Sequence, residues 1–345
     1  MTSKPTFESL DRADRLDALQ VAEAVSNRPA YLLEKDTWVV YTLQALMQTA
    51  FAERLTFKGG TSLSKGYDAI LRFSEDIDIT YDILAVAGDI VAEKGDQDGM
   101  PRNVSQAGKW RKKIRKRLRQ WISEEIEPTL RSRLAVIDEA VTLRSEGEQL
   151  SIGYRPLFDG PAFVKPAVLV DFGALSSGEP REMRVIACDA ARNLPEIDFP
   201  TAKPMVMSPV RTYWEKATAI HVYCCNTKMP SERLSRHWHD LLALDRTTIG
   251  DQALRDRSVA EWVAKHKASF FRERDAGGEE VDYTSAVRGS LRLVPDGDGL
   301  QALKVDYEAM ASSGMLHEDA DSFDSLMAKC KDLEERANLM RLAQH

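Results

Sequence analysis

Two aspartates, Asp76 and Asp78, stand one residue apart in a segment where acidic and apolar residues alternate, FSEDIDITYDI. In an extended strand, a period of two places both carboxylates on one face and Ile77 and Ile79 on the other. Carboxylate, phosphate and water oxygens are the ligands that Mg²⁺ prefers. The pair therefore predicts a strand that holds Mg²⁺, or Mn²⁺ in its place, beside a nucleotide.

A glycine turn lies upstream of this strand. Gly59 and Gly60 are followed by Thr61 and Ser62, and the next residues, LSKGYDAIL, are compatible with a helix. Such a turn exposes backbone N–H groups at the positive end of the helix dipole, which favours a triphosphate, and the two hydroxyls would add donors. Each short motif is common by itself, but their order and separation indicate a nucleotide site. Three residues that lie in the sequence between the turn and the two aspartates are further candidate nucleotide contacts: Lys65, Arg72 and Ser74.

A third carboxylate, Asp171, ends the apolar run Val168–Val170. Aspartates are common in turns that follow strands, and this is one interpretation of Asp171. If its strand lies beside the strand of Asp76 and Asp78, the three carboxylates form the metal site of a two-metal phosphoryl transfer. One ion would then activate the attacking hydroxyl, and the other would hold the triphosphate.

The segments around these motifs predict an α+β fold. Residues 9–27 and 31–51 have apolar residues at helical spacing; Asp11 is placed to cap the first helix, and the second is apolar enough to be largely buried. Three β-like segments begin at Leu150, Val164 and Arg181, and we expect an antiparallel extension of the first sheet. From about Pro209 the pattern becomes helical, which places a boundary near residues 200–208.

Residues 103–126 predict an amphipathic helix with a strongly basic polar face. Apolar residues from Trp110 to Ile126 recur at steps of three to four, and eight of the eleven residues from Lys109 to Arg119 are Lys or Arg. Pro128 is expected to end or kink this helix. One interpretation is a solvated helix face. The other is a surface that contacts the phosphate backbone of a nucleic acid.

The composition excludes several classes of protein. The chain has 345 residues, 43% hydrophobic and 29% charged, which suits a buried core and rules out collagen-like and wholly disordered chains. The net charge of −7 argues against a general coat of positive charge, so the basic helix is a local exception. The four cysteines fit no secreted disulfide framework and no CxxC metal motif. Without a signal-peptide pattern or an apolar segment of membrane length, we expect a cytoplasmic protein with no membrane contact.

Several sequence words together resemble the AbiEii/AbiGii toxin family of nucleotidyltransferases, whose relatives include the MenT toxins. They are EKD at residues 34–36, FKGGTSLSK from Phe57, RFSEDIDI from Arg72, YWEKATAIH from Tyr213 and SRHWHDLLAL from Ser235. Weaker words, GSLRLVP from Gly289 and DYEAM from Asp306, extend the resemblance over most of the chain. The combination of FKGGTSLSK with RFSEDID is its most specific part.

The fold implied by this resemblance is a DNA polymerase β-like nucleotidyltransferase core over residues 1–205, with a mixed or antiparallel sheet and flanking helices. The basic helix near residues 103–126 would be an insertion in this core. A mainly helical C-terminal domain, residues 206–345, would contribute Lys216 and Asp240 to the site.

The resemblance also implies roles for individual residues. Asp76 and Asp78 are implied to be catalytic and to hold metal, and Lys216 to be a catalytic residue that contacts the triphosphate, for which a compact cation is suited. Asp240 matches a late essential aspartate, which acts as a base or orients Lys216. The residues alone also allow Lys216 to be an exposed helix lysine and Asp240 a carboxylate on a helix surface.

The activity implied by the resemblance is Mg²⁺-dependent transfer of a nucleoside monophosphate from an NTP to RNA, at the 3′ end of a tRNA. The chain would be the toxin of a bacterial toxin–antitoxin or phage-defence system. Its partners would be NTP, tRNA bound through the basic helix Lys109–Arg119, and a cognate antitoxin. Two alternatives remain open, namely transfer to a protein hydroxyl and a non-catalytic partner-binding protein with the same fold.

Overall fold

The computed structural model describes residues 4–70, 72–96, 99–160, 164–226, 233–312, 316 and 321–339. The chain forms two compact units. The first, here the sheet unit, contains Met1–Gly66, Ser74–Gly88 and Lys112–Met207. The second, here the helical unit, contains Tyr67–Phe73, Asp89–Arg111 and Ser208–His345. Three helices contain residues of both units: α3 (Gly59–Tyr67), α4 (Ile83–Lys94) and α5 (Val104–Trp121).

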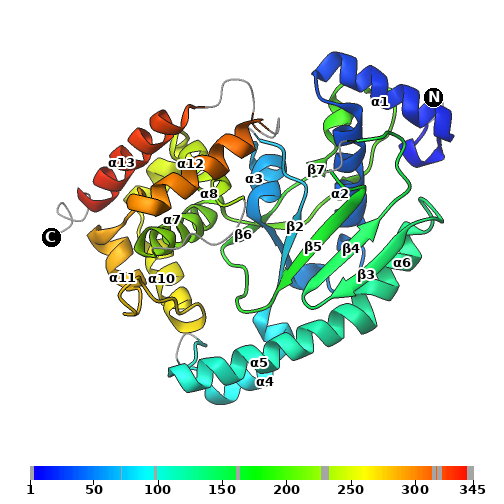
Figure 1. The fold of residues 1–345 in the computed structure, drawn as a ribbon. Helices are drawn as coiled ribbons and strands as arrows, with labels where there is room; N and C mark the ends of the chain where they lie inside the picture. The colour runs from blue at the N-terminus through cyan, green and yellow to red at the C-terminus, as the bar shows by residue number, and fades with distance from the viewer. Residues whose placement is uncertain are drawn as a thin grey trace. The chain divides into compact units, whose positions relative to one another are not determined.

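The sheet unit is built on a seven-stranded sheet with the order β3-β4-β5-β2-β1-β9-β6 (Figure 1). Its strands are β1 (Leu55–Lys58), β2 (Ile77–Tyr81), β3 (Thr142–Glu146), β4 (Gln149–Gly153), β5 (Ala167–Gly173), β6 (Arg181–Met183) and β9 (Met205–Met207). The pairs β2–β5 and β1–β9 are parallel, and the other neighbouring pairs are antiparallel. Two short strands, β7 (Ile186–Ala187) and β8 (Thr201–Ala202), form a separate antiparallel pair. The expected α+β class with a mixed sheet and flanking helices is confirmed.

The antiparallel extension expected after β2 is observed only in part. Strands β3, β4 and β5 pair antiparallel, but β5 runs parallel to β2. A parallel neighbour requires a long crossover connection. The chain between β2 and β5 provides one, because it contains α4, α5, α6 (Glu127–Leu134) and the hairpin β3–β4. As a result, β5 lies on the side of β2 that β1 does not occupy.

Alternating burial shows which face of the central strands belongs to the core. Ile77 and Ile79 of β2 are fully buried, while Asp78 between them is partly exposed. In β5, Val170 is fully buried and Asp171 is partly exposed. Burial of each apolar side chain contributes about 1.5–3 kcal/mol, and a slip of one residue would turn these side chains outward. The same hydrophobic burial therefore fixes the carboxylates on the opposite face.

Helix α1 (Arg12–Ser26) begins after Asp11, whose side chain accepts a 2.9 Å hydrogen bond from the Asp14 N–H, so the expected cap is confirmed. Helix α2 (Ala30–Met47) is buried along nearly its whole length, as expected, but it ends at Met47 and not at residue 51. The described residues of this unit also form three short 3₁₀ helices: η1 (Phe7–Ser9), η2 (Ala52–Arg54) and η4 (Asp189–Arg192).

The predicted basic helix is present as α5. Its apolar stripe is buried, with Trp110, Ile114 and Leu118 each at most 2% exposed. After Trp121 the chain continues as a π-helical segment, η3 (Ile122–Ile126), and then as α6, whose first turn contains Pro128. Because proline has no N–H to donate to the carbonyl four residues earlier, regular α-helical bonding is interrupted just before it. The helix thus changes from α to π geometry just before Pro128, where the sequence predicts an end or a kink.

The helical unit contains α7 (Pro209–Cys225), α8 (Arg236–Asp245), α9 (Thr248–Arg255), α10 (Ser258–Phe270), α11 (Tyr283–Ser285), η5 (Ala286–Ser290), α12 (Gly297–Ser312) and α13 (Phe323–Leu339). Its core contains two fully buried tryptophans, Trp214 and Trp238. The indole N–H of Trp214 donates to the Ala253 carbonyl at 3.2 Å, and that of Trp238 to the Leu293 carbonyl at 2.7 Å. No helix in the described part of the chain is long and apolar enough to cross a membrane.

Candidate active site

Four neighbouring strands place a row of polar side chains on one face of the sheet. In the parallel ladder of β2 and β5, Asp171 lies directly beside Asp78. On the other side, Lys58 at the end of β1 pairs with Asp78, and Gln149 of β4 pairs with Asp171. Neighbouring strands lie about 4.8 Å apart, so the two carboxylates are adjacent. From the sequence alone the strand pairing of Asp171 is open, and neither Lys58 nor Gln149 carries a signal that marks it as a site residue.

The polar row is held by a side-chain contact as well as by backbone pairing. The Gln149 amide Nε2 donates to Asp171 Oδ1 at 2.7 Å, which orients that carboxylate. Asp76 lies just before β2, two residues from Asp78, and it is also partly exposed. The arrangement therefore offers the carboxylate oxygens of Asp78 and Asp171 on one face of the sheet, with Asp76 just before β2; we call these three residues the carboxylate row.

Gly59 connects the glycine turn with this carboxylate row. It is the first residue of α3, with a φ of +79°, a conformation that residues other than glycine rarely adopt. A Cβ at this position would lie 2.0 Å from Asp78 Oδ2. The absence of a side chain thus allows the start of α3 to approach the Asp78 carboxylate. The glycine turn and the aspartate pair, which their order and separation link in the sequence, are therefore in direct contact.

Replacing Gly59 with alanine is expected to reduce the nucleotidyl transfer that the family resemblance implies by about 10²-fold, because displacement of a reacting group by about 1 Å can cost that much. Gly147→Ala is the matched control: Gly147 also has a positive φ, of +63°, but a Cβ there meets no atom within 4 Å. Initial rates of both purified variants would be compared with wild type. Equal rates for Gly59→Ala and Gly147→Ala would show that the contact with Asp78 does not matter.

The hydroxyl groups near the glycine turn bond within the protein. Thr61 Oγ1 donates to the Asp76 carbonyl, so in its 2.8 Å contact with Ser74 it is the serine hydroxyl that donates. Ser62 Oγ donates to the Gly59 carbonyl at 2.9 Å. Thr61 and Ser62 are both fully buried. These bonds tie α3 to the segment that carries Asp76, and the expected hydroxyl contacts to a triphosphate remain predictions.

Two consecutive charged residues of α2 bind other segments of the sheet unit. The Glu34 carboxylate accepts the backbone N–H of Leu157 at 2.7 Å, and burial raises its pKa to about 7. The Lys35 ammonium lies 2.7 Å from Glu75 Oε2 and donates to the Lys165 carbonyl at 3.0 Å. Glu75 directly precedes Asp76, so Lys35 anchors the chain that leads into β2.

The third charged residue of this run, Asp36, holds α3. Its Oδ1 pairs with Lys65 Nζ at 2.5 Å, and its Oδ2 accepts the Asp189 N–H at 2.7 Å. Lys65 also contacts Asp189 Oδ1 at 3.0 Å, and the Lys65 side chain is only 6% exposed. Lys65 thus serves two carboxylates inside the protein, and its expected contact with the triphosphate remains a prediction. Sequence reasoning had no signal for these pairs beyond the EKD word itself.

Asp36→Asn is expected to lower the free energy of unfolding by about 3 kcal/mol, since removing one partner of a buried ion pair leaves the buried Lys65 ammonium with only the more exposed Asp189 carboxylate. Equilibrium urea unfolding measures this loss. The double variant Asp36→Asn/Lys65→Met removes both charges and should recover most of it. If the single and double variants were equally unstable, the ion pair would not be the source of the effect.

In the helical unit, three charged side chains form a buried cluster that we call the Arg72–Lys216–Asp240 triad. Arg72 binds the Asp240 carboxylate with two donors, Nε at 2.6 Å and Nη2 at 2.8 Å, and Lys216 Nζ contacts Asp240 Oδ2 at 2.8 Å. Asp240 is fully buried, and the side chains of Arg72 and Lys216 are 3% and 9% exposed. Burial excludes the interpretation of Lys216 and Asp240 as ordinary surface residues.

The charges of the triad shift each other's protonation. Burial alone would raise the pKa of Asp240, but Arg72 and Lys216 outweigh it and hold that pKa well below its usual value. Burial lowers the pKa of Lys216, and Asp240 opposes this change. A carboxylate with such a low pKa is a poor proton acceptor at neutral pH. Of the two roles expected for Asp240, orientation of Lys216 therefore fits better than general base.

The carboxylate row has the donor chemistry for a divalent cation. Mg²⁺ in nucleotide sites is commonly held by one or two carboxylates together with water and substrate phosphates. Asp76 and Asp78 supply such a pair, and Asp171 stands beside Asp78. Within the residues described, no three His, Cys, Asp or Glu side chains already stand as a metal-binding group. The remaining ligands of a cation bound here would come from NTP and water.

Comparison with known proteins gives a family match over most of the chain. A family model described as nucleotidyl transferase AbiEii toxin, type IV TA system, matches residues 41–329. Among solved structures, a similar one is MenT4, a nucleotidyltransferase toxin from Mycobacterium tuberculosis H37Rv, with 17% identity, coverage of 96% of this chain and 99% of that one, and a TM-score of 0.41. No curated protein matches this chain. The family match includes the carboxylate row and the Lys216 and Asp240 positions.

Proposed function

Because the chain belongs to the AbiEii family of nucleotidyltransferase toxins, we propose that it transfers a nucleoside monophosphate from an NTP to the 3′ end of a tRNA and that the reaction requires Mg²⁺. The observation that carries the proposal is the contact of Gly59 with Asp78. This contact places the start of α3, where backbone N–H groups favour phosphate, against the Asp78 carboxylate. Asp171 lies beside Asp78 in the neighbouring strand.

In the proposed reaction, the 3′-hydroxyl oxygen of the RNA bonds to the α-phosphorus of the NTP. The bond from that phosphorus to the bridging oxygen breaks, pyrophosphate leaves, and the hydroxyl proton is released to solvent. The backbone at Gly59 and Gly60 would bind the phosphates, and Asp76, Asp78 and Asp171 would hold Mg²⁺. When bound there, Mg²⁺ supplies charge stabilisation at the phosphate oxygens and lowers the pKa of the attacking hydroxyl.

The assignment of Lys216 to the triphosphate rests on the resemblance of its WEKAT segment to the family. Its support in this structure is the bond to Asp240, which holds the ammonium in one position within the helical unit. A fixed cation loses less conformational entropy on binding phosphate than a mobile surface lysine does. The role of Lys216 remains a prediction, as do those of Ser74 and Arg72.

The exposed face of α5 supports an RNA acceptor. Lys109, Lys112, Lys113 and Lys116 are exposed, opposite the buried apolar stripe. By contrast, Arg119 pairs with Glu148 at 2.5 Å. Lysines on such a face neutralise backbone phosphates without reading sequence. The proposed substrates, NTP and tRNA, agree with the expectation that the protein acts in the cytoplasm.

Charge reversal on α5 tests this interface. In the variant Lys112→Glu/Lys113→Glu/Lys116→Glu, we expect tRNA affinity to fall and the slope of log affinity against log salt to shrink by roughly 2, since each lost phosphate contact removes about 0.7–0.9. Binding of NTP should be unchanged. Arg144→Glu on β3, where the side chain is 83% exposed, is the control. A salt slope equal to that of wild type would remove α5 from the RNA interface.

The proposed function is tested by incubating the full-length protein with tRNA, Mg²⁺ and each α-³²P-labelled NTP in turn. Label should appear on tRNA, and periodate oxidation of the tRNA 3′ end beforehand should prevent it. Label on protein in the presence of intact tRNA would overturn the choice of acceptor. The family description, a type IV toxin–antitoxin system, supports a cognate antitoxin as a further partner; its co-expression should relieve growth inhibition by the chain.

A further inference from the structure

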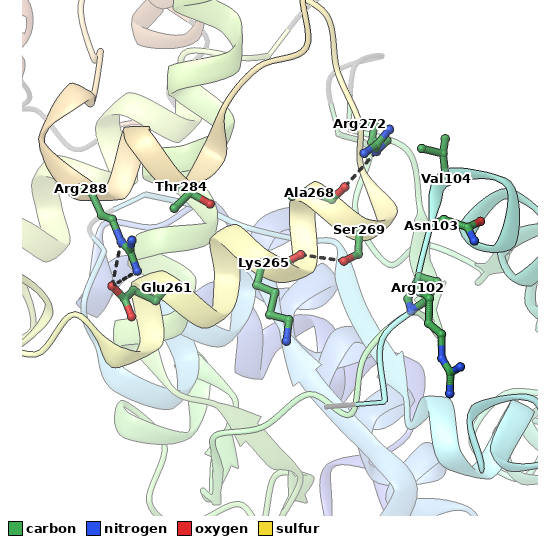
Figure 2. A pocket seen from close by; sticks show the side chains of 11 residues that line it. Arg102, Asn103, Val104, Glu261, Lys265, Ala268, Ser269, Arg272, Thr284 and Arg288 are labelled. Carbon is green, nitrogen blue, oxygen red and sulfur yellow. Dashed lines mark hydrogen bonds and ion pairs between the residues drawn. The ribbon is translucent and has the colours of Figure 1, made fainter. Parts of the chain in front are cut away.

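A pocket in the helical unit has no role in the function proposed so far. Its volume is about 500 Å³, enough for a nucleotide-sized group. Figure 2 shows that the segment Arg102–Val104, at the start of α5, borders one side and that α10 borders the other. The polar side chains that reach it from α10 and the following residues include Lys265, Ser269 and Arg272. A polar pocket of this size is suited to a charged ligand.

The lining of the pocket is predominantly basic. Four of its residues are cationic, namely Arg102, Lys265, Arg272 and Arg288, and one, Glu261, is acidic. Glu261 pairs with Arg288 at 2.9 Å, as the dashed lines in Figure 2 show. The side of the pocket formed by Arg102, Lys265 and Arg272 therefore has three cationic side chains and no acidic side chain of the lining that pairs with them.

The carboxylates that neutralise this side are weakly bound and lie outside the lining. Lys265 pairs with Asp96 at 3.6 Å and Arg272 with Glu280 at 2.9 Å, and both cations are more than a third exposed. Arg102 is exposed and donates to the Gly95 carbonyl at 3.1 Å. Exposed ion pairs contribute at most about 1 kcal/mol. An anion with several acceptor oxygens can therefore compete for these cations, and phosphate suits the forked donors of arginine.

The lining also distinguishes between two sources of phosphate. A site for a free nucleotide or an unstacked base usually provides an aromatic face for the base. None of the eleven lining residues is aromatic. The Thr284 hydroxyl and the Asn103 amide add donors instead, whereas the Ser269 hydroxyl donates to the Lys265 carbonyl. The chemistry of the pocket thus fits a backbone phosphate better than a nucleobase.

We infer that this pocket binds a backbone phosphate of the RNA acceptor. The inference rests on the proposed function, because it takes the RNA acceptor as given, and it adds a contact on the helical unit to the one proposed for α5. Arg102 and Lys265 would bind the phosphate oxygens from opposite sides, with the Asn103 amide as an additional donor. Such a contact is independent of base identity.

The test compares full-length wild type with Arg102→Gln/Lys265→Gln in titrations with tRNA at several salt concentrations. Since one phosphate contact contributes about 0.7–0.9 to the salt slope, we expect the slope to shrink by about 1 and affinity to fall several-fold at low salt. NTP binding and the thermal unfolding temperature should not change. Lys304→Gln/Lys331→Gln, which neutralises two exposed lysines of α12 and α13 in the same unit, should behave like wild type.

Each contrary result has a separate meaning. If wild type binds tRNA and the pocket variant keeps the full slope, the pocket inference is wrong and the proposed function stands. If the variant loses NTP binding with an unchanged tRNA slope, the pocket takes a free nucleotide, which also overturns the inference. If wild type neither binds nor labels tRNA, the RNA acceptor itself is wrong, and the inference falls with it.

Discussion

Asp78→Asn is expected to lower the rate of nucleotidyl transfer by about 10³-fold, because loss of charge stabilisation at a transferring phosphate costs several kcal/mol. The substitution keeps the size of the side chain and its place beside Asp171 but removes the negative charge. The buried residues on either side, Ile77 and Ile79, should keep β2 in register. The fold should therefore survive while the reaction fails.

This expectation is checked by initial rates of label transfer at saturating NTP, together with circular dichroism of the variant. Glu179→Gln is a suitable control, since its side chain is 57% exposed and on the same unit. Asp76→Asn should show a comparable loss. If Asp78→Asn retained more than about a tenth of the wild-type rate, a metal-binding role for this carboxylate would be untenable, given the size of effect that such ligands have.

Asp240→Asn is expected to destabilise the helical unit by about 3–5 kcal/mol, the cost of leaving buried charges without their partner. Two buried cations, Arg72 and Lys216, bind this fully buried carboxylate. Thermal and urea unfolding, followed by tryptophan fluorescence, would measure the change. The triple variant Arg72→Met/Lys216→Met/Asp240→Leu, which removes all three charges, should be markedly more stable than Asp240→Asn.

The pH dependence gives a second readout of the same cluster. The pKa of Asp240 is lowered in the folded state, so its contribution is fully present above the ordinary aspartate pKa of about 3.9 and is lost as pH falls below that value toward the folded pKa. Titration of Asp240 should therefore leave wild-type stability unchanged from pH 5 to 8, and the stability difference between wild type and Asp240→Asn should shrink as the solution becomes more acidic than about pH 4. A difference that did not shrink in this acidic range would contradict the ion pairing of Asp240.

Local pattern was sufficient to predict the strand that carries the carboxylates. Alternation along β2 predicted buried Ile77 and Ile79 with Asp78 on the other face, and the burial of these residues confirms it. The cap at Asp11 and the apolar stripe of α5 are local in the same way. In each case the signal lies within a few residues, where the periodicity of strand or helix decides which side chains share a face.

The parts that could not be predicted join residues far apart in the chain. Arg72 and Asp240 are separated by 168 positions, and neither helical spacing nor turn chemistry relates them. The pairing of Asp171 with Asp78 depends on a crossover that brings β5 beside β2, and a sequence alone gives no register for strands so far apart. The charge of Lys65 is visible in the sequence and suggests a contact with the phosphates. Its pairing with Asp36 of α2 cannot be seen there.

The central claim is that Asp76 and Asp78 hold a divalent cation together with NTP, and calorimetric titration of Mn²⁺ in the presence of a non-hydrolysable NTP analogue tests it most directly. Wild type and Glu179→Gln should bind Mn²⁺ with the same affinity, and Asp78→Asn should bind it about 100-fold more weakly, corresponding to about 2.7 kcal/mol. Equal Mn²⁺ affinity of Asp78→Asn and wild type would contradict the account.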